Sequence, residues 1–353
     1  MERMSSYQRV QATLNHEEPD RVPVHFFCSL KSASLLGINN YQEYLQKPEY
    51  ISQGELSFYN KFHLDSLLVF TDLCIVPEAY GCKVRYYTNN SPSVAGHIIN
   101  ELEDYEKLEV LDPLKGGRMP TIIKATELLT KKMKKKVPVT VGYMHPLGTL
   151  LDLRGRERGL ADIILHPALL HKALETVTQT IAEFLKECAY AGADGLFIAP
   201  GGYGGVLTQE QALKFGIKYD AKLIEILKKE TGLRVTAHFC GRKPFIDLCL
   251  REYPPIEILS WWDKGSNLSL SEAKKKYGDK ICLSSGLDQN KTLLFGSPVD
   301  VEMEAKEAIK IAAKGGGYIL APGCEISHRT PDENLFAILE AARKYGNYPI
   351  SDK

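Results

Sequence analysis

Eight short apolar runs, each followed by a helix-like segment, constrain the fold of this chain more than any other feature of its sequence. Most of the runs are apolar almost without interruption, as expected for parallel strands that are covered on both faces. They are Val22–Phe27, Ser66–Phe70, Val137–Tyr143, Gly195–Ala199, Arg234–Cys240, Ile256–Trp262, Lys280–Ser285 and Gly317–Ala321. Strands that alternate with helices eight times predict an α/β fold, specifically a (β/α)8 TIM barrel.

The segments between these runs place apolar residues three and four positions apart, which is the spacing of an amphipathic helix. Clear examples are Pro167–Tyr190, Gln209–Glu230, Val299–Lys314 and Asp332–Tyr345. A doubly wound dinucleotide-binding fold is the alternative for such a pattern, but no GxGxxG motif follows the first run. We therefore expect a single barrel domain over residues 1–353.

Segment Gly81–Asn100 breaks the alternation of strands and helices. Its sequence, GCKVRYYTNNSPSVAGHIIN, has a cluster of turn residues between two short strand-like pieces. We expect a small β-hairpin inserted after the second strand.

The charge and hydropathy of the chain exclude several classes of protein. Lys and Arg (44) balance Asp and Glu (44), so the chain lacks the basic excess typical of nucleic-acid binding. No apolar run approaches the roughly 20 residues of a membrane-spanning helix, and the first residues have no apolar signal core. The eight cysteines are scattered rather than closely spaced. We expect a reduced, cytoplasmic protein with neither a nucleic-acid nor a membrane partner.

Chemically active side chains gather where the predicted strands end, and the active sites of (β/α)8 barrels lie at that end. Almost every position there is polar, sulfur-bearing or aromatic. We predict a substrate pocket lined by Tyr143, His145, Tyr203, Trp262 and Asp288.

His238 and Cys240 lie two residues apart at the end of the fifth predicted strand, in the stretch RVTAHFCG. Side chains two apart on a strand face the same side, so both can point to one ion. Cys324 ends the eighth strand at the same rim. One imidazole and two thiolates suit zinc better than magnesium or calcium, and three protein ligands leave one position open, as in catalytic zinc sites. We therefore predict that these three residues bind a catalytic zinc ion.

Ordinary packing is the alternative for these three residues, because free cysteine is among the most buried residue types. An HxC pair alone is a weak pattern. The position of Cys324 at a strand end, between Gly323 and Glu325, favours a metal site. Packing is the better interpretation for the remaining cysteines, which are Cys28, Cys74, Cys82, Cys188, Cys249 and Cys282.

Two carboxylates near the predicted zinc are candidates for catalytic roles. Glu325 follows the third ligand and can occupy the open zinc position at rest or support the ligands, and a solvated loop carboxylate is the equal alternative. Asp72 ends the second strand and can orient the substrate or steady a ligand histidine. An ordinary structural hydrogen bond is the alternative for Asp72.

Six longer stretches of the sequence carry a family resemblance that extends over nearly the whole chain. They are SYQRVQATLNHEEPDRVPV, FTDLCIVPEAYGCKV, AGADGLFIAPGGYGG, VTAHFCG, SSGLDQNKTLLFGSPVDV and GGGYILAPGCEISHRTPDENLFAILEAARKYG. The chain resembles the uroporphyrinogen decarboxylase superfamily, and within it the zinc-dependent methyltransferases that act with corrinoid proteins, such as methylcobamide:coenzyme M methyltransferases. In those enzymes an HxC pair and a distant cysteine hold zinc, and the matching residues here are His238, Cys240 and Cys324.

The chain departs from the decarboxylases of that superfamily near its N-terminus. Those enzymes carry an arginine-rich motif, close to RQAGRY, that grips the propionates of the tetrapyrrole. The corresponding stretch here, HFFCSLKSASLLG, has Lys31 as its only Lys or Arg. A substrate with many carboxylates would be poorly paired there, and an unpaired buried charge is costly. Because decarboxylation in that family also uses no metal, uroporphyrinogen decarboxylation is the weaker alternative.

The resemblance implies a methyltransferase that uses Zn2+ and a corrinoid (cobalamin) carried by a partner protein. A small-molecule thiol bound at zinc would be held as a thiolate, which can attack the methyl group on cobalt. In the opposite direction, zinc would act as a Lewis acid on a methoxy compound, as in O-demethylation. Two thiolate ligands make the site electron-rich, which slightly favours the thiol direction. We also allow for a homodimer.

Overall fold

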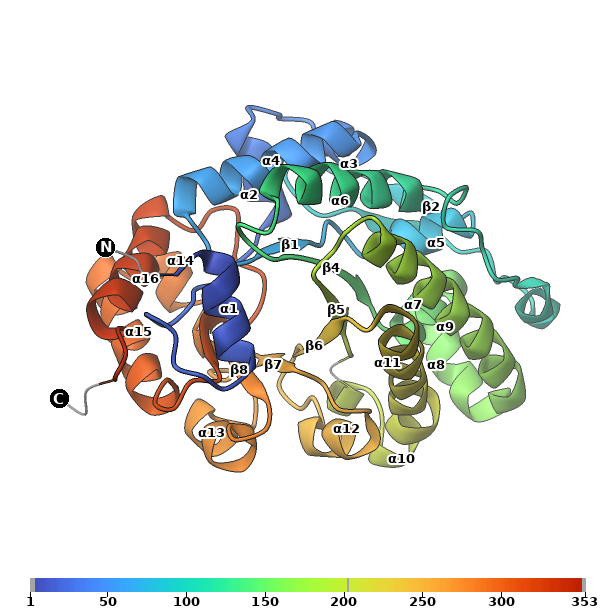
Figure 1. Cartoon of the computed structure of the whole chain (residues 1–353). Helices are drawn as coiled ribbons and strands as arrows, with labels where there is room; N and C mark the ends of the chain where they lie inside the picture. The colour runs from blue at the N-terminus through green and yellow to red at the C-terminus, as the bar shows by residue number, and fades with distance from the viewer. Residues whose placement is uncertain (1–3, 202, 351–353) are drawn as a thin grey trace.

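The computed structural model describes residues 4–201 and 203–350 and shows an α/β fold built around one curled parallel sheet (Figure 1). Within these residues seven strands follow the order β1-β4-β5-β6-β7-β8-β9. They are β1 (Leu67–Val69), β4 (Val139–Met144), β5 (Gly195–Ala199), β6 (Arg234–Phe239), β7 (Ile258–Trp261), β8 (Cys282–Leu287) and β9 (Tyr318–Pro322). Each coincides with or overlaps one of the last seven predicted runs. Because the strands are parallel, their carboxyl ends meet at one rim, which we call the mouth.

The prediction that residues 22–27 form a regular strand is wrong. This segment makes one parallel bridge, between Val24 and Leu320 of β9. On the side of β9, Pro23 has no N–H with which to extend the pairing, and on the other side the N–H of Val24 donates to the Asp65 carboxylate (2.8 Å) rather than to a strand. The curled sheet therefore has seven regular strands, with an irregular segment where an eighth was predicted.

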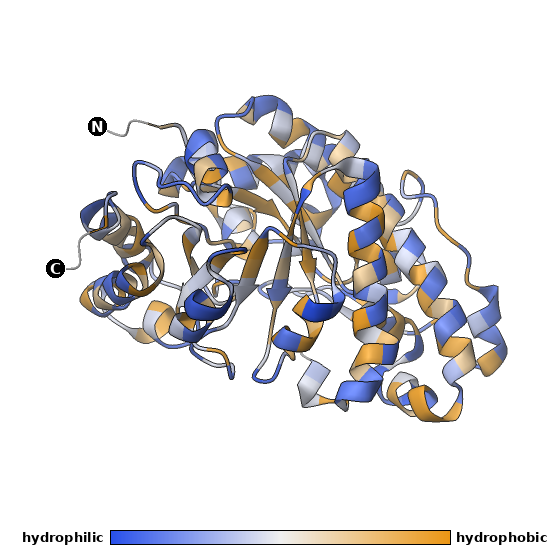
Figure 2. Cartoon of the chain, turned by 60° about the horizontal axis from the view of Figure 1, so that its bottom comes forward, coloured by the Kyte–Doolittle hydropathy of each residue, from blue (hydrophilic) through white to orange (hydrophobic). Residues whose placement is uncertain are grey.

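Helices surround the sheet, and Figure 2 shows most of them divided between apolar and hydrophilic residues. They are α1 (Ser6–Leu14), α2 (Ser29–Leu35), α3 (Tyr41–Gln46), α4 (Pro48–Phe62), α5 (Ile75–Ala79), α6 (Met119–Met133), α7 (Pro146–Arg154), α8 (Arg156–Leu165), α9 (Pro167–Tyr190), α10 (Gln209–Gln211), α11 (Lys218–Thr231), α12 (Ile246–Glu252), α13 (Leu270–Tyr277), α14 (Thr292–Phe295), α15 (Pro298–Ala312) and α16 (Asp332–Tyr345). In the described part of the chain, none of these helices is long and apolar enough to cross a lipid bilayer.

The predicted helices agree with the structure except at one place. Helices α9 and α16 have the predicted bounds, and α15 lies within one residue of its predicted start. The predicted stretch Gln209–Glu230 is helical without a break, but its geometry changes at a π-helical turn, Ala212–Ile217, which joins α10 to α11. A Cβ atom on Gly216 in that turn would lie 2.5 Å from the Tyr203 ring. The absence of a side chain at Gly216 therefore leaves the space that this ring occupies.

A second, two-stranded antiparallel sheet lies between β1 and β4 in the chain. Strand β2 (Lys83–Arg85) pairs with β3 (Ser93–Gly96). Its connecting turn supplies Asn89, Asn90 and Ser91 to the wall of a cavity at the mouth. This part of the chain therefore contributes to the site even though it stands outside the main sheet.

Candidate metal centre

Three soft ligand atoms converge at the mouth. His238 lies in β6 with its side chain buried, Cys240 follows that strand, and Cys324 follows β9. Their ligand atoms all lie within 4.8 Å of one another. His238 Nε2 is 2.9 Å from Cys240 Sγ, which is 3.6 Å from Cys324 Sγ. The structure thus brings together the three residues that the sequence predicts as ligands.

The two thiols of this cluster influence each other strongly. The hydrogen bond between them lowers the pKa of Cys324 well below its usual value, against the effect of burial. The same hydrogen bond, followed by burial, raises the pKa of Cys240. One thiolate is therefore favoured in the protein alone, and a second negative charge here requires a cation. A divalent metal ion that prefers nitrogen and sulfur ligands meets this requirement.

The loop that carries Cys324 fits tightly against the end of β7. A Cβ atom on Gly323 would lie 2.6 Å from the Trp262 Cα and 2.7 Å from its Cδ1, so only glycine allows this approach. The Nε1 atom of Trp262 is buried and has no hydrogen-bond partner among the described residues. Trp262 therefore lies beside the ligand loop with an unused donor, and its role in lining the substrate pocket stays a prediction.

A cavity of about 490 Å3 lies at the mouth and reaches the ligand loop through Glu325. Burial, followed by the charge of Cys324, raises the pKa of Glu325 to about 8. Its Oε1 accepts a long hydrogen bond from the N–H of Ser29 (3.4 Å). The other lining residues are Cys28, Leu30, Asn89, Asn90, Ser91, Asn290, Leu294, Ile326, Ser327, His328 and Arg329. A small polar molecule in this cavity would contact Glu325, the residue that follows the candidate ligand Cys324.

Comparison with known proteins assigns the chain to a family. The model of the uroporphyrinogen decarboxylase (URO-D) family matches residues 5–345. This chain belongs to the URO-D family. A uroporphyrinogen decarboxylase of Wigglesworthia glossinidia brevipalpis is 25% identical over 304 residues, which cover 83% of this chain and 81% of the relative.

Among solved structures, a methyltransferase from Methanosarcina mazei resembles this URO-D family member over almost its whole length. The TM-score is 0.85 and the sequence identity 26%, with 97% of this chain and 99% of the other covered. A B12-independent methionine synthase from Shewanella is 14% identical with a TM-score of 0.52, covering 86% of this chain and 89% of the other. The second likeness concerns the fold alone.

Asp72 follows β1 and is buried in a network of hydrogen bonds. Its two oxygens accept from Arg118 Nη1 (2.7 Å) and Nη2 (2.9 Å). Its Oδ1 also accepts from the N–H of Cys74 (2.8 Å). These partners hold the carboxylate in an ion pair, so the structural alternative for Asp72 has direct support, and a role in orienting substrate stays a prediction.

The predicted pocket residue Tyr143 is fully buried and engaged elsewhere. Its hydroxyl donates to the carbonyl of Leu73 (3.0 Å) and accepts from the N–H of Val76 (3.3 Å). These bonds tie β4 to the segment around α5. The structure gives Tyr143 a packing role, and none of its bonds reaches the metal cluster.

His145 and Tyr203 lie together in a buried network that contains two residues the sequence did not indicate. The Tyr203 hydroxyl lies 3.0 Å from His145 Nδ1 and donates to Asp220 Oδ2 (2.5 Å). The Tyr253 hydroxyl donates to the same oxygen (2.7 Å). Burial lowers the pKa of His145 to about 3 and raises that of Asp220 to about 7. His145 is thus a neutral side chain held at the end of β4.

The last predicted pocket residue, Asp288, closes a turn. Its Oδ1 accepts from the N–H groups of Asn290 (2.9 Å) and Lys291 (3.1 Å), which precede α14. The loop that Asp288 shapes carries Asn290 into the mouth cavity. Asp288 therefore supports the pocket wall, while its carboxylate is occupied by backbone donors.

Proposed function

We propose that this protein is a zinc-dependent methyltransferase that moves a methyl group between a corrinoid protein and a small molecule bound at zinc. The observation that carries the proposal is the convergence of His238, Cys240 and Cys324 at the strand ends. Three ligands of this type leave a coordination position free, which distinguishes a catalytic from a structural zinc site. The methyltransferase from Methanosarcina mazei, similar over the whole chain, supports the same reaction class.

Bound zinc would lower the pKa of a thiol or polarise the oxygen of a methyl ether. The residues of the chain supply the rest of the site. His238 offers Nε2, and Cys240 and Cys324 offer two sulfurs, whose negative charge favours a nucleophilic thiolate over a strong Lewis acid. The mouth cavity beside Glu325 would hold the body of the substrate.

In the thiol direction, the sulfur of the substrate forms a bond to the methyl carbon while the carbon–cobalt bond breaks. The electron pair of that bond stays on cobalt, and the thiol proton is released to solvent. We propose that a partner protein carries the large corrinoid ring in the cell and docks at the mouth. We propose the same docking for the reverse, O-demethylating reaction. If the protein forms a homodimer, the contact between its subunits has to leave the mouth open for this partner.

Uroporphyrinogen decarboxylation is the second candidate, because curated relatives carry that name. The environment of Lys31 weighs against it. Lys31 Nζ bonds to Asp332 Oδ1 (2.8 Å) and donates to the carbonyl of Thr330 (2.7 Å), so its charge is already compensated. The segment that would have to bind several propionates therefore offers no free Lys or Arg among its described residues.

The test is a methyl-transfer assay with free methylcobalamin as the probe. Zinc-loaded protein is mixed with methylcobalamin and one thiol at a time, and the methyl thioether is measured by mass spectrometry. We expect product that disappears after chelation and in Cys324→Ala, but persists in Cys282→Ala, which alters a buried cysteine outside the cluster. Metal-independent turnover of uroporphyrinogen, with no transfer to thiols or from methoxy compounds to cob(I)alamin, would contradict the proposal.

A further inference from the structure

One layer of the barrel interior places a hydroxyl directly behind the candidate ligand His238. His238 of β6 is in register with Ser260 of β7, which is in register with Ser284 of β8. Ser260 Oγ lies 3.0 Å from His238 Nδ1, and both residues are buried. The other ring nitrogen, Nε2, faces Cys240 Sγ at 2.9 Å. The two nitrogens of the imidazole are thus assigned to different partners.

The packing around this imidazole restricts its rotation. The ring of Phe197 stacks on it with a centroid distance of 5.3 Å and an interplanar angle of 23°. Phe197 itself packs against Phe27 and Leu68 inside the barrel. The aromatic contact fixes the plane of the imidazole, and the hydroxyl fixes which edge of the ring points down the barrel.

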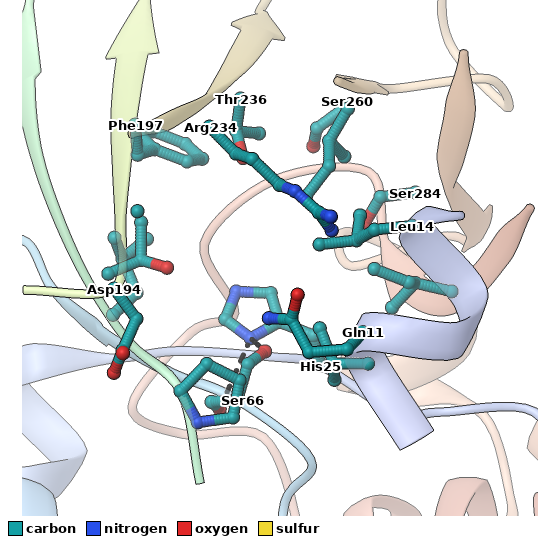
Figure 3. A pocket seen from close by; sticks show the side chains of 17 residues that line it. Gln11, Leu14, His25, Ser66, Asp194, Phe197, Arg234, Thr236, Ser260 and Ser284 are labelled. Atoms are coloured by element: carbon teal, nitrogen blue, oxygen red, sulfur yellow. Dashed lines mark hydrogen bonds between the residues drawn. The ribbon is translucent and has the colours of Figure 1, made fainter. Parts of the chain in front are cut away.

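The small size of Ser260 is unusual for a barrel interior, where bulky branched side chains dominate. Ser260, Ser284 and Thr236 are among the residues that line a cavity of about 70 Å3 (Figure 3). A larger apolar residue at position 260 could fill part of this space. The cavity indicates that packing alone does not explain a serine at position 260.

We propose that Ser260 is the positioning residue of the metal centre. Its hydroxyl accepts the Nδ1–H of His238 and so holds the tautomer in which the Nε2 lone pair faces the ligand position. Ligand histidines generally depend on such a partner, whose loss weakens metal binding about 10–100-fold. This inference rests on the proposed zinc site. It concerns the residue at Nδ1 of His238, whereas the zinc would be bound at Nε2.

The test compares Ser260→Thr with Ser260→Val, which have the same shape and differ in the hydroxyl. The additional methyl group of threonine or valine can occupy the cavity that Ser260 lines. Zinc affinity is measured by competition with a chromophoric chelator, and thermal unfolding of the zinc-free proteins checks that both variants fold. We expect Ser260→Val to bind zinc about 10–100-fold more weakly than wild type, and Ser260→Thr to stay within about threefold. Ser284→Ala, in the same layer, should match wild type.

Each outcome bears on the inference separately from the proposed function. Equal zinc affinities of the Thr and Val variants, with wild type binding zinc tightly, would overturn the role of Ser260 and leave the zinc site intact. A wild-type protein that binds no zinc would overturn both. If Ser260→Val does not fold, Ser260→Ala replaces it in the comparison, with the same expected loss.

Discussion

Two polar clusters at opposite ends of the curled sheet use their side chains in different ways. At the amino end of the strands, Arg9 and Arg21 both bond to the buried Asp65, at 2.6 and 2.7 Å. At the mouth, two cysteines share one hydrogen bond, and Trp262 keeps a buried donor without a partner among the described residues. Because partnered buried charges stabilise the fold and unpartnered groups cost free energy, we assign the Asp65 cluster to stability and the cysteine cluster with Trp262 to binding.

Removal of Asp65 should produce the largest effect on stability. Asp65→Ala leaves two buried guanidinium groups without their shared carboxylate and removes the acceptor of the Val24 N–H. Loss of one partner of a buried ion pair costs about 3–5 kcal/mol. Urea denaturation should show this loss, while the zinc affinity of the folded variant stays that of wild type.

Asp112→Ala is the control for that variant, because Asp112 pairs with Lys115 on the exposed surface. Its denaturation midpoint should equal that of wild type. If Asp65→Ala is as stable as this control, the division of roles between the Asp65 cluster and the cysteine cluster is wrong.

Asp220 should make stability fall as pH rises from about 4 to 7. Burial raises the pKa of Asp220 to about 7 in the folded chain, above the value of about 3.9 in the unfolded chain. Between these values the folded state holds a proton that the unfolded state has lost, so folding is favoured at the lower pH. Asp220→Asn stays neutral and should remove this contribution, of about 2–4 kcal/mol.

The measurement for Asp220 is the free energy of unfolding of both proteins at pH 5 and pH 8. Wild type should lose more stability than Asp220→Asn on going to pH 8. Parallel changes in the two proteins would show that the network of Asp220 with Tyr203 and Tyr253 does not bind the proton as described.

The two adjacent tryptophans offer a last comparison, between a ring N–H with a partner and one without. Trp261 Nε1 donates to the carbonyl of Leu268 (2.8 Å), whereas Trp262 Nε1 has no partner among the described residues. Phenylalanine removes the same atoms at both positions. Trp261→Phe should therefore be less stable than Trp262→Phe in chemical denaturation, by about 1 kcal/mol for the lost bond and by a further packing loss because Trp261 is fully buried. An equal or reversed order would mean that the donor of Trp262 is satisfied in solution.

Strand alternation predicts the convergence of His238, Cys240 and Cys324, because this geometry follows from local rules. Residues two apart on a strand face one side, and parallel strands end at one rim, so His238, Cys240 and Cys324 had to approach one another if the strands were correct. The buried state of the other six cysteines also agrees with the prediction of packing.

The sequence could not show contacts that depend on register between strands or on the far side of a helix. Ser260 is one residue in an apolar run until its pairing with His238 is known. Asp220 looks like an exposed residue of a charged helix, although Tyr203 and Tyr253 bury it. The irregular first segment depends on the carboxylate of Asp65, which lies far from Val24 in the chain.

The zinc content and coordination of the purified protein test the central claim most directly. Metal analysis and X-ray absorption should show about one zinc per chain with one nitrogen and two sulfur ligands, the sulfurs at about 2.3 Å, and a fourth ligand that a thiol can exchange. His238→Ala and Cys324→Ala should lose the zinc, and Cys282→Ala should keep it. A protein without zinc, or with a fourth permanent protein ligand, would contradict a catalytic zinc site at the mouth.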